Sequence, residues 1–160
     1  MTPPLRWTPD PERDLVLERD IDVPREKVWA AWTEPEHLRR WFTPAPWTVA
    51  SCRIDLRPGG VFHVVMRSPE GEEHPSSGCY LEVVPCERLV WTDALLPGYR
   101  PAETPFMTGL LALAARGAGT HYRAVAMHRN AEDRRRHQDM GFHEGWGKAL
   151  DQLVAHVQTL

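Results

Sequence analysis

The stretch that decides the fold reads LVLERDIDVPREKVWAAWTEPEHLRRWF and covers residues 15–42. Its first part, 15–21, alternates in the period-two pattern of a strand with one polar face. Pro24 then begins a helix, because a proline in the first turn loses no hydrogen bond there. Pro35 begins a second short helix, which ends before Pro44. The segment therefore predicts one strand followed by two short helices.

The middle of the chain, residues 47–129, reads as a series of further strands. Turn sequences at 58–60 (Pro-Gly-Gly) and 69–71 (Pro-Glu-Gly) separate the first of them, and glycines near 117–119 separate the last two. Six apolar-rich strands linked by short turns favour one antiparallel meander. The strand at 15–21 would complete a sheet of seven.

The end of the chain changes to a helical period. The sequence GFHEGWGKALDQL covers residues 141–153 and continues an apolar stripe at helical spacing, formed by Trp146, Leu150, Leu153 and Val157. We expect one long helix from about residue 131 onward. Each of the three glycines in this region, Gly141, Gly145 and Gly147, costs about 1 kcal/mol relative to alanine inside a helix. They therefore predict either a close approach to the sheet or a bend.

Four segments together resemble one protein family: residues 23–42, the turn at 58–60 with the strand after it, GCYLEVVPCERLVWT at 78–92, and 141–153. In combination they are similar to the activator-of-Hsp90-ATPase-like branch of the START/Bet v 1-like superfamily. The resemblance implies an α+β helix-grip fold, in which a curved antiparallel sheet of about seven strands wraps a long C-terminal helix. It also implies a ligand held between sheet and helix, but it supplies no shared catalytic signature.

Domain organisation follows from length and proline content. With 160 residues the chain can bury one core, and we predict a single domain at 14–160. Four prolines within residues 1–13 predict a flexible N-terminal arm.

Charge and cysteine content exclude several classes. The net charge of −3 predicts no nucleic-acid partner, and the short run at 134–136 is interpreted as a solvated helix face. The three cysteines contain no C-x-x-C pair, which argues against a disulfide framework and fits a reducing cytoplasm. The first residues lack the apolar run of a signal peptide, and no apolar stretch approaches the roughly 20 residues of a membrane span. We therefore predict a cytoplasmic protein.

Candidate site residues are polar, aromatic or sulfur-containing side chains within apolar segments. His63 and Asp93 are the candidates for acid and base, although both faces of the strand around His63 are apolar and leave its direction open. We expect the following residues to line a ligand pocket: His63, Trp91, Asp93, Met107, Tyr122, Met140 and Trp146.

Three functional hypotheses remain open from the sequence. The first is binding of a small apolar or aromatic molecule in an internal cavity. The second is a cyclase or dehydratase that uses His63 and Asp93, and the third is an interaction module for a chaperone or another protein. The histidines at 121, 128, 137 and 143 lack a metal-ligand spacing, so we predict neither a metal nor a cofactor. Dimerisation stays open.

Overall fold

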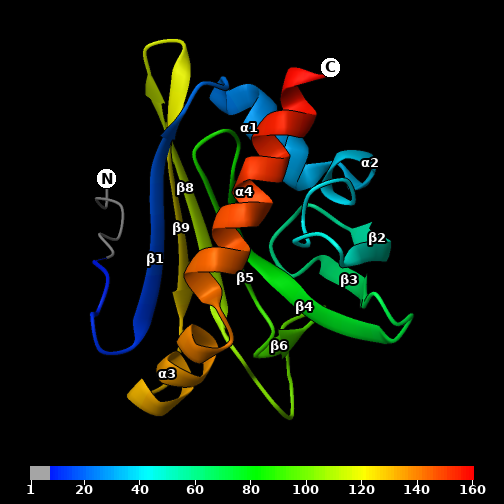
Figure 1. The fold of residues 1–160 in the computed structure, drawn as a ribbon. Helices are drawn as coiled ribbons and strands as arrows, with labels where there is room; N and C mark the ends of the chain where they lie inside the picture. Colours follow the sequence, from blue (N-terminus) through cyan, green and yellow to red (C-terminus); the bar gives the residue numbers. More distant parts are fainter. Residues whose placement is uncertain (1–7) are drawn as a thin grey trace.

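The larger layer of the fold is a seven-stranded antiparallel sheet, seen in a computed structural model that describes residues 8–160 (Figure 1). The strand order is β1-β9-β8-β5-β4-β3-β2. Consecutive strands pair from β2 to β9, apart from a small separate hairpin, and β1 closes the edge beside β9. The sheet strands are β1 Asp14–Ile21, β2 Thr48–Ile54, β3 Val61–Arg67, β4 Glu73–Val84, β5 Arg88–Thr92, β8 Thr108–Arg116 and β9 Gly119–Met127. The predicted α+β fold with a seven-stranded meander is confirmed.

Two short helices follow β1, as predicted. Helix α1 spans Arg25–Thr33 and α2 spans Pro35–Leu38. Helix α1 buries Val28, Ala31 and Trp32 on one face. Pro35 occupies the first turn of α2, where its missing N–H has no intrahelical partner to lose. Figure 1 shows both helices beside the end of the long C-terminal helix.

The C-terminal helical region differs from the single helix that the sequence predicts. It consists of α3 (Ala131–Asp139) and α4 (Phe142–Gln158), and α4 lies across the sheet (Figure 1). Gly141 separates the two helices with a φ of 94°, a left-handed conformation that glycine adopts without steric cost. The predicted bend is therefore a break between two helices.

A second glycine allows a close approach between α4 and the sheet. A Cβ atom on Gly147 would lie 2.7 Å from Nη2 of Arg19, which belongs to β1. The Arg19 side chain crosses α4 at this point and forms an ion pair with Asp151. The glycine thus makes room for the side chain that connects the sheet edge to the helix.

The connection after β5 leaves the main sheet. Strand β5 ends at Thr92, and a two-stranded hairpin follows, formed by β6 (Leu95–Leu96) and β7 (Arg100–Pro101). Asp93 therefore lies in a loop, where its side chain can bind main-chain groups.

The described part of the structure begins at residue 8, within the predicted N-terminal arm. Residues 1–7 of that arm lie outside the described residues. Residues 10–14 form a hydrogen-bonded turn, in which the N–H groups of Arg13 and Asp14 donate to the Asp10 carbonyl. No helix within residues 8–160 has the length and apolarity needed to span a membrane.

Candidate functional site

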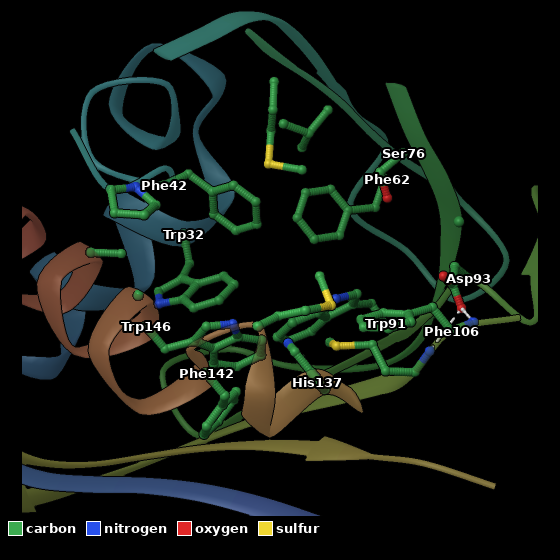
Figure 2. Close-up of a pocket in the computed structure, with 18 of the residues that line it drawn as sticks. Trp32, Phe42, Phe62, Ser76, Trp91, Asp93, Phe106, His137, Phe142 and Trp146 are labelled. Atoms are coloured by element: carbon green, nitrogen blue, oxygen red, sulfur yellow. Dashed lines mark hydrogen bonds between the residues drawn. The ribbon is translucent and has the colours of Figure 1, made fainter. Parts of the chain in front are cut away.

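A cavity of about 370 Å³ lies between the sheet and α4. The strands β3, β4 and β5 provide one wall, and the C-terminal helices provide the opposite wall (Figure 2). Its lining residues are mostly apolar: Trp32, Trp41, Phe42, Pro44, Phe62, Val64, Met66, Gly78, Trp91, Phe106, Met107, Met140, Gly141, Phe142, Gly145, Trp146 and Ala149, together with Ser76, Thr92, Asp93, Tyr122 and His137.

Five aromatic side chains form a connected cluster along the cavity. The ring centroids of Trp32 lie 5.0 Å from Trp41, 5.1 Å from Trp91 and 5.8 Å from Phe42. Phe62 continues the cluster at 5.9 Å from both Phe42 and Trp91. Edge-to-face and tilted contacts of this kind are the favoured geometry for aromatic pairs. The cluster gives the cavity a preformed apolar surface suited to an aromatic ring.

Tyr122 adds a polar group to this apolar wall. Its hydroxyl oxygen accepts a hydrogen bond from Nε1 of Trp32 at 3.2 Å. Complete burial raises the pKa of Tyr122, because ionisation would place a charge in an apolar interior. The hydroxyl therefore keeps its proton and can donate a hydrogen bond to an acceptor in the cavity.

Asp93 holds the chain segment that leads into β8. Its Oδ1 atom accepts hydrogen bonds from the N–H groups of Phe106 at 2.8 Å and Met107 at 3.1 Å. Phe106 and Met107 both line the cavity, so Asp93 positions part of the wall. Figure 2 shows these hydrogen bonds at the side of the cavity away from α4.

His137 is a second buried ionisable side chain of the lining, with 6% of its surface exposed. Its Nδ1 lies 2.9 Å from Nε2 of His128, and Nδ1 of His128 lies 2.8 Å from the main-chain oxygen of Arg13. Burial, reinforced by the neighbouring His128, lowers the pKa of His137 to about 4. Its ring packs against Phe106 and Phe142, with centroids 4.7 and 5.3 Å away.

Six of the seven residues predicted to line a pocket lie on the cavity wall: Trp91, Asp93, Met107, Tyr122, Met140 and Trp146. Met140 is 68% exposed and lies at the opening, whereas Tyr122 is 2% exposed and lies inside. Whether these residues bind a ligand stays a prediction.

His63 does not line the cavity. It alternates along β3 with Phe62, Val64 and Met66, all of which do. Because successive side chains of a strand point to opposite faces, His63 points away from the cavity. The structure therefore does not bring His63 and Asp93 together, and the geometry that the predicted acid–base pair requires is missing.

His137 was not among the residues predicted to line the pocket. From the sequence it was considered only as a candidate metal ligand. The sequence does contain a pattern that indicates the orientation of its hydrogen-bond partner, His128. Tyr122, Ala124, Ala126 and His128 share one face of the β9 segment, and the first three are fully or almost fully buried. That pattern indicates that His128 faces inward, where a histidine needs a hydrogen-bond partner.

The described residues were also compared with the ligand clusters that hold metal ions. Within residues 8–160, no group of three or more His, Cys, Asp or Glu side chains is placed to hold a metal ion.

Comparison with known proteins decides the family. The family model of the activator of Hsp90 ATPase homolog 1-like protein matches residues 22–158. The chain belongs to this family. The match covers both short helices, the sheet from β2 onward and nearly all of α4, so the resemblance seen in the sequence is confirmed.

Solved structures show the same fold across this family. A crystal structure of a protein from Nitrosomonas europaea is 49% identical, covers 94% of this chain and 97% of its own, and has a TM-score of 0.92. A protein from Chromobacterium violaceum is 25% identical over 89% of this chain and 95% of its own, with a TM-score of 0.73. One from Aeromonas hydrophila, at 22% identity over 91% and 92%, shares the fold with a TM-score of 0.67. None of the curated proteins matches the chain.

Proposed function

We propose that this protein binds a small, largely apolar or aromatic molecule in the cavity between the sheet and α4. The observation that supports this most strongly is the cavity itself, with a volume of about 370 Å³ and a lining dominated by aromatic side chains. Ligand sites are typically concave, mainly apolar and provided with a few directed polar groups. Tyr122 and His137 are such groups.

The size of the cavity limits the ligand. Ligand pockets commonly measure roughly 300–1,000 Å³, so this cavity lies near the lower end. A molecule of one or two aromatic rings is therefore a better match than a long acyl chain. The exposed Met140 and Ser76 mark a route by which such a molecule can enter.

Native mass spectrometry of protein purified gently from its own host tests the proposal. We expect a reproducible additional mass of small-molecule size on the wild-type chain. Ala149 lines the cavity and is 7% exposed, so Ala149→Phe should fill the space and abolish the additional mass. Ala155, on the same helix, is exposed to solvent and provides the matched control Ala155→Phe, which should retain the ligand. A bound mass that persists in folded Ala149→Phe protein would place the ligand elsewhere.

A further inference from the structure

His137 has a single ring nitrogen without a hydrogen-bond partner in the described part of the chain, in a cavity lined mainly by apolar side chains. Its Nδ1 is engaged by His128, and no residue within 8–160 forms a hydrogen bond with its Nε2. The surrounding rings of Phe106, Phe142 and Trp146 have no hydrogen-bonding group directed at it. Figure 2 shows His137 beside these aromatic residues on the cavity wall.

The protonation of this nitrogen follows from the hydrogen-bond chain behind it. The main-chain oxygen of Arg13 can only accept, so Nδ1 of His128 carries a proton. In a neutral His128 ring, Nε2 is then an acceptor. The proton between the two rings must come from Nδ1 of His137. A neutral His137 that is protonated at Nδ1 has a bare lone pair at Nε2.

Burial supports the neutral state of His137. Its side chain is 6% exposed, and a positive charge on the ring would lose most of its hydration. The low pKa of His137 agrees with this assignment. The wall therefore offers a hydrogen-bond acceptor whose protonation is set by the hydrogen-bond chain behind it.

We propose that the ligand is an aromatic compound with a phenolic hydroxyl, whose O–H donates a hydrogen bond to Nε2 of His137. This inference rests on the proposed function, because it identifies the chemical class of molecule that the same cavity takes. The aromatic cluster around Trp32 supplies the apolar contact for the ring, and His137 supplies the acceptor for the hydroxyl.

Other ligand classes fit these groups less well. A carboxylate brings only acceptors and would face both the lone pair of His137 and the Asp93 carboxylate. A ketone or ether could accept a hydrogen bond from the Tyr122 hydroxyl, but it has no proton to donate to Nε2 of His137. An ammonium group could donate, but a cation would lose its hydration in a cavity lined mainly by apolar side chains. A neutral hydroxyl on an aromatic ring satisfies both the acceptor and the apolar wall.

Calorimetric titration with two matched probes tests the inference on the full chain. We would use 7-hydroxycoumarin and 7-methoxycoumarin, which differ only in the proton at one oxygen and the methyl group that replaces it, with unsubstituted coumarin as a smaller reference. The titrations are made below the pKa of the free phenol, so that 7-hydroxycoumarin is neutral. We expect the wild-type protein to bind 7-hydroxycoumarin about tenfold more tightly than either other probe.

Variants assign that preference to His137. In His137→Phe the tenfold preference should disappear while 7-methoxycoumarin still binds, because the cavity is kept and only the acceptor is removed. His128→Leu is a second route to the same test, since it removes the partner that holds the His137 proton at Nδ1, and it should reduce the preference. His156→Phe changes a histidine outside the cavity lining and should keep the preference unchanged.

The outcomes separate the two proposals. Equal binding of all three probes by the wild-type chain would overturn the phenol inference and leave the binding function standing. A preference that persists in His137→Phe would also overturn it, because the acceptor would then be another group. If none of the probes binds the wild-type protein, the phenol inference fails, whereas the small-ligand function fails only if native mass spectrometry also shows no additional mass.

Discussion

Helix α4 has a pair of histidines near each of its ends, and the two pairs have nearly the same spacing, although their rings are inclined by 77° and 53°. The cavity pair, His128 and His137, has nitrogens 2.9 Å apart and ring centroids 5.2 Å apart. The outer pair, His37 and His156, has nitrogens 3.0 Å apart and ring centroids also 5.2 Å apart. The pairs differ in their surroundings, since both rings of the cavity pair are buried and both rings of the outer pair are half-buried.

The difference shows that a third partner, rather than the contact between two rings, sets the chemistry of a histidine pair. The Arg13 carbonyl fixes which nitrogen of His128 carries a proton and, through it, the tautomer of His137. In the outer pair no residue within 8–160 hydrogen-bonds to the second nitrogen of either ring. Either ring of the outer pair can therefore donate to the other, and solvent can reach both.

The largest expected difference between the pairs is in the pH dependence of stability. The pKa of His137 is lowered to about 4, so between about pH 6.5 and 4 the unfolded chain binds a proton that the folded chain does not. The free energy of unfolding should therefore fall by up to about 3 kcal/mol as the pH falls through this window. Urea denaturation across these pH values measures the loss.

The matching variants show which pair is responsible. His137→Phe should remove most of the slope between about pH 6.5 and 4. Burial, together with His37 and Arg40, also lowers the pKa of His156, but this ring is half-buried, so His156→Phe should remove a smaller part. An unchanged slope in His137→Phe would contradict the buried, neutral state of His137.

A smaller difference is expected when one partner of each pair is removed at neutral pH. His128→Leu leaves Nδ1 of buried His137 without an acceptor and should lower the free energy of unfolding by about 1–3 kcal/mol. His37→Leu leaves the half-buried His156 free to bind water and should cost less than about 1 kcal/mol. Denaturation curves of the two variants give the comparison, and equal losses would mean that burial does not distinguish the pairs.

The smallest effect is spectroscopic and involves no loss of stability. Nitrogen-15 chemical shifts of the imidazole rings should show His128 and His137 each as a single neutral tautomer with the proton on Nδ1. His37 and His156 should show averaged shifts from exchange between tautomers. A protonated Nε2 on His137 would make this nitrogen a hydrogen-bond donor and contradict the expected acceptor.

Most of the fold could be predicted because its signals are local. The alternation at 15–21, the prolines that begin α1 and α2, and the turn sequences between strands act over a few residues each. The break at Gly141 was harder, because a glycine near a helical stripe is compatible with either a bend inside one helix or a boundary between two.

The site was only partly predictable. Large aromatic and sulfur-containing residues such as Trp91 and Met107 are usually buried, so their place on an internal wall could be anticipated. Which face of β3 lines the cavity could not be predicted. Apart from His63 itself, residues 61, 63 and 65 are nearly as apolar as residues 62, 64 and 66. His137 was hidden for another reason: its neighbours in α3 are mostly charged, and its partners are a strand end and a carbonyl distant in sequence.

The pairing of β1 with β9 has a consequence for how the protein matures during synthesis. Arg13 and His128 are separated by 115 positions, so the carbonyl that orients the cavity pair is translated long before its partner. Domains emerge from the ribosome N-terminal end first, and contacts between distant residues form only after both have emerged. A nascent chain that already has α1, α2 and the strands β2 to β8 would still lack the His137 acceptor. The chain therefore gains the oriented acceptor of the cavity only after residue 137 has been translated and β9 has paired with β1.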